Sequence, residues 1–392
     1  MTARALARPA ASALALVLAG GALAGCTDNR PAASAGANPR SLAVTATDTE
    51  CQVSATQAPA GPLTFTVTNG GAQVTEFYLL GSDGLRILGE VENIGPGLTR
   101  DLVVAAQPGQ YFTACKPGMV GEGIRAAFTV DAAADAPTTS AEDSQLVEQA
   151  NREYQLYVKD QTEQLLAKTK KFAALYTAKK DAEARALYAD ARTHWERIEP
   201  VAESFGDLDP KMDAREADLQ QGETWTGWHL IEKDLWPQRA KGYKPLSDAQ
   251  RKAAASDLVA NTQTLYDRTR TISFTVDQIA NGAKALLDEV ATGKVTGEEE
   301  YWSRTDLYDF AANVDGARVA WQGLRPILTK RDKTLDAELE TRFAALDRLL
   351  AQHRSGSGYV GYDQLSDAQI KQLSDAVNAL SEPLSKLTAA VI

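Results

Sequence analysis

The chain has 392 residues, a formal net charge of −11 at neutral pH, three cysteines and three histidines. That length is sufficient for two ordinary domains. The negative charge argues against nucleic-acid binding, because a phosphate backbone repels it, and it favours cationic ligands.

Residues 1–25 have the features of a secretion signal. Two arginines precede an apolar stretch rich in Ala and Leu, which is shorter than the roughly 20 residues of a membrane-spanning helix. It ends in Leu23-Ala-Gly-Cys26, which resembles a bacterial lipoprotein cleavage box. We expect lipidation of Cys26 to hold the mature chain, with a charge of −13 once those arginines are removed, at the extracytoplasmic face of the cell membrane. Plain secretion is the alternative.

A β-rich region follows. Residues 26–40 are rich in Pro, Ala, Ser and Gly and predict a flexible tether. Residues 41–131 contain short alternating segments such as Leu63–Val67, followed by the strong turn signal Asn69-Gly-Gly71. This pattern is typical of a small all-β sandwich. Residues 132–142 predict a linker.

The remainder of the chain, residues 143–392, has a helical pattern. Apolar residues recur at helical spacing, and Gly and Pro become sparse. We expect breaks at residues 205–206, 241–245, 293–297 and 355–358. The helices between these breaks are long enough for an all-α bundle, and no strand pattern follows residue 143.

The strongest metal-ligand pattern is the segment GWHLIE, in which His229 and Glu232 are three residues apart. This spacing places both on one helix face, so that both can reach one metal ion. Further ligands have to come from elsewhere, and Glu199, Glu203 and Asp213 are the preferred candidates. One histidine among carboxylates is an oxygen-rich set that favours iron, manganese or calcium.

A less specific interpretation competes with this metal site. Residues 196–236 hold eleven acidic and four basic side chains, and most of the acids can simply form a solvated face. His229 can be a hydrogen-bonded core histidine, as we expect for His194 and His353. The neighbouring tryptophans, Trp225, Trp228 and Trp236, either pack in the core or line the pocket.

Four linked segments resemble the EfeO-type iron-uptake lipoproteins: Trp195–Asp209, Met212–Arg215, Trp225–Glu232 and Thr305–Gly316. The resemblance covers residues 41–392. It implies a multidomain fold, with a cupredoxin-like β-sandwich followed by an imelysin-like helical bundle that carries the H-x-x-E motif.

The same resemblance implies a function. The chain would be the iron-binding component of an EfeUOB-type uptake system, capturing Fe2+ or Fe3+ outside the membrane. It would deliver the iron to a permease of the oxidase-dependent iron transporter type. A haem-dependent dye-decolourising peroxidase is the usual third component. These expectations describe a binding protein and not an enzyme.

Enzymatic and structural functions remain open. Zinc peptidases use H-E-x-x-H or its inversion, and this chain has neither motif. A ferroxidase would need a second metal site, for which Asp306 and Asp309 are the candidates. A carbohydrate- or polyanion-binding lipoprotein is another alternative, although the acidic charge argues against anionic ligands, and a structural envelope lipoprotein is also compatible with the sequence.

Cys51 and Cys115 are the cysteines that remain after lipidation. In an oxidising compartment such a pair favours a disulfide. The alternative is a metal site of Cys51, Glu76 and Cys115, with copper as the metal. Members of the resembling family are proposed to use two Cys, a Glu and a Met here, but Thr113 occupies the position of that Met.

The β region differs from an ordinary blue-copper protein. Residues 41–131 contain no histidine, whereas a blue-copper centre needs two. Its acidic residues Glu90 and Glu92 precede a turn and are expected to be solvated loop acids.

Overall fold

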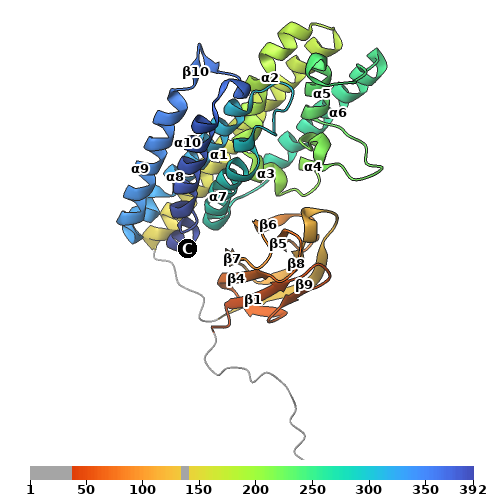
Figure 1. Cartoon of the computed structure of the whole chain (residues 1–392). Coiled ribbons are helices and arrows are strands. Elements are labelled where there is room, and N and C mark those ends of the chain that lie inside the picture. The colour runs from red at the N-terminus through yellow and green to blue at the C-terminus, as the bar shows by residue number, and fades with distance from the viewer. Residues whose placement is uncertain (1–37, 134–140) are drawn as a thin grey trace, which may run out of the picture. The chain divides into compact units, whose positions relative to one another are not determined.

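The computed structural model describes residues 38–133 and 141–392 (Figure 1). The predicted leader, the expected lipidation site Cys26 and most of the predicted tether lie outside the described residues. Asn38–Ile392 belong to a single unit, in which strands β1 to β9 precede helices α1 to α11. The described helices include none that is long and apolar enough to span a membrane.

The described part of the N-terminal region contains nine strands in two sheets. One sheet has four strands in the order β2-β1-β4-β7, and the other has five strands in the order β3-β9-β8-β5-β6. The bounds are β1 Ser41–Ala46, β2 Cys51–Val53, β3 Gln57–Pro59, β4 Gly61–Asn69, β5 Thr75–Leu80, β6 Ile87–Ile94, β7 Thr99–Ala106, β8 Gly109–Cys115 and β9 Ile124–Asp131, with a 3-10 turn η1 at Pro117–Met119.

The two sheets enclose an aromatic core, as the alternating pattern of the sequence predicts. Leu63, Phe65 and Val67 on β4 are fully buried, and the ring of Phe65 packs 5.2 Å from that of Phe77 and 5.6 Å from that of Phe128. β4 pairs in parallel with β1 and antiparallel with β7. A sandwich with its core between two sheets is the fold expected from the sequence.

The helical region contains long helices joined by short irregular segments. Its helices are α1 Ala141–Thr177, α2 Asp181–Glu196, α3 Glu199–Glu203, α4 Asp209–Met212, α5 Trp228–Leu235, α6 Asp248–Thr269, α7 Val276–Thr292, α8 Asp306–Arg331, α9 Lys333–Ala351, α10 Asp367–Leu384 and α11 Leu387–Val391. The 3-10 turns are η2 Glu216–Asp218, η3 Pro237–Arg239, η4 Lys294–Thr296 and η5 Tyr362–Gln364, and the short strands are β10 Arg354–Ser355 and β11 Gly358–Tyr359.

Local sequence explains several of these boundaries. Ser247 and Ser366 cap α6 and α10, each accepting a hydrogen bond from the backbone N–H of a glutamine three residues later. Gly206, with φ of 73°, lies in the break between α3 and α4. The predicted break at residues 355–358 is a small hairpin, β10–β11, so the expectation that no strand follows residue 143 is wrong at this one turn.

Aromatic side chains dominate the core of the bundle. Trp195 and Trp228 are fully buried, and the ring of Trp228 packs against Phe172 at 5.2 Å and Tyr188 at 5.9 Å. Trp228 is therefore a core residue. It anchors α5 against α1 and α2, and the next residue in the chain is His229.

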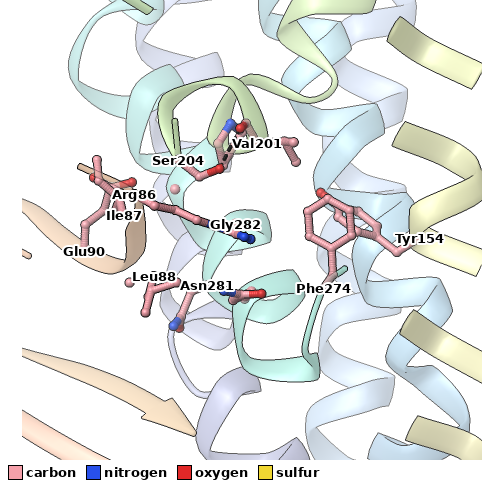
Figure 2. Close-up of a pocket in the computed structure, with 14 residues that line it drawn as sticks. Arg86, Ile87, Leu88, Glu90, Tyr154, Val201, Ser204, Phe274, Asn281 and Gly282 are labelled. Atoms are coloured by element: carbon pink, nitrogen blue, oxygen red, sulfur yellow. Dashed lines mark hydrogen bonds between the residues drawn. The ribbon is translucent and has the colours of Figure 1, made fainter. Parts of the chain in front are cut away.

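Hydrogen bonds also join strands to helices within this unit. The N–H of Ala105 on β7 donates to Asp277 Oδ2 at 2.9 Å, and Asn281 Nδ2 donates to the carbonyl of Val103 at 2.9 Å. A cavity of about 60 Å³ lies nearby, lined by residues of β6, α1, α3 and α7 (Figure 2). In Figure 2, Tyr154 and Phe274 form one side of this cavity.

Candidate metal centre

A glycine brings Asp213 next to the start of α5. Gly227 has φ of 88°, and a Cβ atom there would lie 2.2 Å from the carbonyl oxygen of Met212. Only glycine tolerates both this conformation and this approach. The hydroxyl of Thr226 donates to the carbonyl of Lys211 at 2.7 Å and closes the same loop. Asp213 thereby lies beside His229, although the two residues belong to separate segments of the chain.

His229 is fully buried, and its two ring nitrogens face different groups. Nε2 lies 3.4 Å from Asp213 Oδ1 and 3.5 Å from Glu299 Oε1, and it has no hydrogen-bond partner among the described residues. Nδ1 lies 3.3 Å from Glu232 Oε2. Neighbouring ligands of a first-row metal ion lie roughly 3.0–3.5 Å apart. The Nε2 side therefore has the spacing of a metal site.

Glu232 is held by the opposite wall of the site. Its Oε1 accepts the backbone N–H groups of Trp302 at 2.8 Å and Ser303 at 2.6 Å, while Oε2 faces His229. A carboxylate in this position keeps the proton of the imidazole on Nδ1 and leaves the lone pair of Nε2 free for a metal. The H-x-x-E spacing can thus supply one ligand and the group that orients it.

Asp213 is oriented by neighbours that lie on another helix. Trp195 Nε1 donates to its Oδ2 at 2.7 Å, and Arg192 Nη2 donates to the same oxygen at 3.3 Å. Arg192 Nη1 contacts Oδ1. These contacts fix the carboxylate with Oδ1 toward His229.

Glu299 and Glu300 complete the surroundings of His229, and neither was among the site residues predicted from the sequence. Glu299 faces Nε2 of His229, while Glu300 forms an ion pair with Arg192 Nε at 2.6 Å and accepts a hydrogen bond from the hydroxyl of Ser303 at 2.7 Å. The available signal was the acidic run at residues 298–300 directly before Tyr301-Trp302. A run of acids usually indicates a solvated loop, so burial could not be inferred from it.

Three groups of ligand atoms lie within 4.8 Å of one another: Asp213, His229 and Glu299; His229, Glu232 and Glu300; and Glu196, Glu199 and Asp213. All of these residues are buried.

Negative charge exceeds positive charge in this region of the described structure. Arg192 and Lys294 are the fully buried cations. Arg192 contacts carboxylates on several elements, at positions 196, 213, 299, 300 and 309. The buried carboxylates around the two cations are Glu196, Glu199, Asp213, Glu232, Glu299, Glu300, Asp306 and Asp309. A surplus of buried carboxylates stabilises an additional cation.

The protonation states follow from these contacts. Burial lowers the pKa of His229 and Arg192 lowers it further, but the adjacent carboxylates of Asp213, Glu232 and Glu299 outweigh both and raise it well above its usual value. Burial raises the pKa of Asp213, but Arg192 and His229 outweigh burial and hold it well below its usual value. Burial and the charge of Glu300 raise the pKa of Glu232 to about 7. Protons and metal ions therefore compete for these groups.

Glu199 and Glu203 lie four residues apart on α3, as predicted, but have different neighbours. Glu199 is buried beside Lys294 and Asn313. Glu203 is half-buried and belongs to none of the three groups. Burial, followed by the charges of Glu90 and Glu199, raises the pKa of Glu203 well above the usual value.

Glu90 and Glu92 lie on strand β6 and are half-buried, so the expectation of solvated loop acids is wrong. Burial and the nearby charge of Glu76 raise the pKa of Glu90 to about 8. No local pattern of the sequence indicates this partial burial.

Asp306 and Asp309 begin α8 and are fully buried at the edge of the same charged region. Asp306 Oδ1 accepts the N–H of Glu300 at 3.0 Å, and Asp309 Oδ2 lies 3.4 Å from Arg192 Nε. They join the acidic surroundings of Arg192 and belong to none of the three groups of ligand atoms found in the described residues.

In the β region, Cys51 on β2 and Cys115 on β8 form a disulfide that links the two sheets. The alternative copper site of Cys51, Glu76 and Cys115 is therefore not the arrangement found, because both sulfurs are used by the disulfide. Glu76 instead accepts a hydrogen bond from the Tyr78 hydroxyl and lies 3.6 Å from Lys116 Nζ.

Comparison with known proteins shows which family this chain belongs to. Residues 150–387 match the imelysin family (Peptidase_M75), and residues 14–130 match the cupredoxin-like domain family. The iron uptake system component EfeO of Yersinia pestis is 36% identical over 348 residues, which cover 88% of this chain and 89% of that protein. This chain belongs to the EfeO family of iron uptake components.

Further relatives of this EfeO-family chain agree. The iron uptake system component EfeO of Escherichia coli O1:K1 is 35% identical over 354 residues, covering 88% of this chain and 89% of that protein. An Efem/EfeO family lipoprotein of Staphylococcus haemolyticus is 39% identical over 253 residues, covering 64% of this chain and 86% of that protein. The expected fold, a cupredoxin-like region followed by an imelysin-like helical region, is confirmed.

Proposed function

We propose that this EfeO-family chain captures iron, as Fe2+ or Fe3+, outside the membrane through His229 Nε2, Asp213 and Glu299. One observation carries this proposal: a fully buried imidazole nitrogen without a hydrogen-bond partner in the described residues faces two carboxylate oxygens at 3.4 and 3.5 Å. Nitrogen and carboxylate oxygen together suit a borderline transition-metal ion better than calcium.

The opposite ring nitrogen supports the same assignment. Glu232 holds Nδ1 while its second oxygen is occupied by two backbone N–H groups. Metal-binding histidines usually have such a partner on the second nitrogen. In this proposal Glu232 orients His229, and Glu203 is not a ligand.

Delivery and location are further parts of the proposal. The bound iron would pass to a permease of the oxidase-dependent iron transporter type, with a haem-dependent dye-decolourising peroxidase as third component. Support comes from the relatives, which are named as components of an iron uptake system. Attachment to the membrane through lipidated Cys26 is supported by the leader sequence and by the staphylococcal relative, which is named a lipoprotein.

Calorimetric titration of the mature protein with Fe(II) under anaerobic conditions, and with Fe(III)-citrate, tests iron capture. We expect one equivalent to bind, with the affinity reduced on the order of 100-fold or more by His229→Ala and by Asp213→Asn, because each removes a direct ligand.

Two buried residues outside the centre provide matched controls. Asp336 accepts a hydrogen bond from Trp321 Nε1, as Asp213 does from Trp195, and His353 is buried with an Nε2 that has no partner within the described chain. Asp336→Asn and His353→Ala should leave iron affinity unchanged. Equal affinity in His229→Ala and wild type would contradict the proposed ligands.

We further propose that iron is bound without turnover. An oxygen electrode during Fe(II) loading in air distinguishes binding from ferroxidase activity. We expect the protein to add no catalytic oxygen uptake to that of free Fe(II). Oxygen uptake over many turnovers would favour ferroxidase activity instead.

A further inference from the structure

A buried lysine occupies a second cation position next to the proposed iron site. Lys294 follows α7 in the turn η4, and its side chain is 1% exposed. Its Nζ lies 2.9 Å from both carboxylate oxygens of Glu199 and 3.1 Å from Glu196 Oε2. Three carboxylate oxygens thus surround one ammonium group inside the bundle.

The same carboxylates could hold a metal ion. The oxygens of Glu196, Glu199 and Asp213 lie within 4.8 Å of one another, and Asp213 also faces His229. Two cation positions therefore share one aspartate, which is how many two-metal centres are built. The Lys294 ammonium contacts two of the three carboxylates of the second position, those of Glu196 and Glu199.

The fold holds the lysine firmly in this position. The hydroxyl of Tyr362 donates to the carbonyl of Val295 at 2.5 Å. Gly297, with φ of 74°, ends the turn against the Tyr362 ring, where a Cβ atom would lie 2.6 Å from the ring. Asn313 on α8 donates to Glu199 at 2.9 Å and fixes the carboxylate that receives the ammonium. These contacts come from three separate segments.

We propose that Lys294 is a built-in cation that fills the second position and limits the centre to a single metal ion. This inference rests on the proposed function, because it presumes that the neighbouring His229 position binds iron. A tethered ammonium offsets part of the negative charge of Glu199 and Glu196, whatever the metal concentration. A divalent ion placed beside it would meet like charge at close range in a buried site.

Metal stoichiometry tests the inference. We expect wild type to bind one equivalent of Mn(II) or anaerobic Fe(II), and Lys294→Gln to bind two, because glutamine removes the charge and leaves the carboxylates of Glu196 and Glu199 free. The double variant Lys294→Gln/Glu199→Gln should return to one equivalent, since it removes a ligand of the second position. Lys294→Arg keeps the charge and should bind one.

A lysine in a different ion pair serves as the matched control. Lys284 on α7 is half-buried and pairs with Asp288, outside the charged region around His229. Lys284→Gln should bind one equivalent, as wild type does. Circular dichroism of each variant checks that it is folded before the titration is interpreted.

Each outcome is decisive. A folded Lys294→Gln that binds one equivalent overturns the inference, and so do two equivalents in wild type. Electron paramagnetic resonance of wild type in excess Mn(II) gives the same answer even if Lys294→Gln does not fold: isolated protein-bound ions support the inference, and an exchange-coupled pair overturns it. Wild type that binds no metal contradicts the proposed function itself and removes the premise of this inference.

Discussion

At the scale of single residues, the centre depends on how the two nitrogens of His229 are divided. Nδ1 faces Glu232, and Nε2 faces Asp213 and Glu299. Removing a direct ligand should reduce the metal affinity more than removing an orienting group, because the orienting group acts only through the imidazole. Variants of Glu232 and Glu299 can therefore separate the two roles.

We predict that Glu299→Gln weakens iron binding more than Glu232→Gln does. Loss of an orienting carboxylate reduces metal affinity roughly 10- to 100-fold, and loss of a ligand should exceed this. Anaerobic Fe(II) titration of both variants measures the difference. If Glu232→Gln caused the larger loss of affinity, Glu232 would be a direct ligand, as the H-x-x-E spacing predicts. Glu203→Gln should have no effect on the affinity.

A second prediction at this scale concerns His194, whose Nδ1 lies 2.8 Å from Gln161 Oε1. Burial, assisted by Lys168 and Arg197, lowers the pKa of His194 to about 4. The folded state therefore holds this ring neutral, whereas the unfolded chain takes up a proton near pH 6.5. Stability is fully present above that value and falls as the pH decreases toward 4.

Protonation of His194 in the unfolded chain should lower the free energy of unfolding by about 1–2 kcal/mol at about pH 5 relative to about pH 7.5, once screening by nearby solvent is included. Urea denaturation at both pH values measures it, with His194→Gln as the comparison. The variant should lose less stability than wild type over this interval. Equal losses in both proteins would show that His194 titrates normally in the folded state.

At the scale of elements, the loop between α4 and α5 determines which side chains meet. Gly227 allows the chain to pass within contact distance of Met212, so that Asp213 and His229 become neighbours. A similar approach occurs at Gly316 on α8, where a Cβ atom would lie 2.4 Å from the carbonyl oxygen of Arg197. Both glycines lie in the segments that resemble the EfeO-type proteins. At both positions a side chain would collide with a backbone carbonyl oxygen.

We predict that Gly227→Ala destabilises the protein by roughly 2–4 kcal/mol and weakens iron binding, because the added methyl group meets a backbone carbonyl at a strained φ. Denaturation and Fe(II) titration measure the two effects. Gly323→Ala on α8 is the control, since its Cβ would meet nothing within 4 Å of the described atoms. It should be neutral or stabilising. Equal stability of the two variants would contradict this account of the loop.

At the scale of the whole molecule, the β region and the helical region have different sources of stability. The sheets are joined by the disulfide between Cys51 and Cys115, which are 64 residues apart. The bundle relies on a large aromatic core and on the buried charges around Arg192. Removing the disulfide should therefore reduce the stability of the β region more than that of the helical region.

We predict that Cys51→Ala/Cys115→Ala loses about 4 kcal/mol of stability in the β region, because the crosslink no longer restricts a long segment of the unfolded chain. Iron binding at His229 should remain at one equivalent with unchanged affinity. Guanidinium denaturation and Fe(II) titration check the two statements. A loss of iron binding in the folded double variant would show that the cysteines contribute to the metal site.

The sequence by itself determined the order and type of the two regions, and it placed His229 and Glu232 on one face of the same helix. Alternation over Leu63–Val67 and helical periodicity after residue 143 are local patterns, and so is a spacing of three residues on one helix. The resemblance to EfeO-type proteins, carried by linked local segments, indicated the family for the same reason.

The tertiary structure decided the composition of the centre. Glu299, Glu300 and Lys294 lie more than 60 residues from His229 along the chain, and Arg192 lies on another helix. Acidic runs and single lysines have the same local pattern whether they are solvated or buried. Their burial and the separate surroundings of Glu203 follow from the packing of distant segments, which no local spacing in the sequence encodes. The cysteine pair by itself favoured the disulfide that the structure contains.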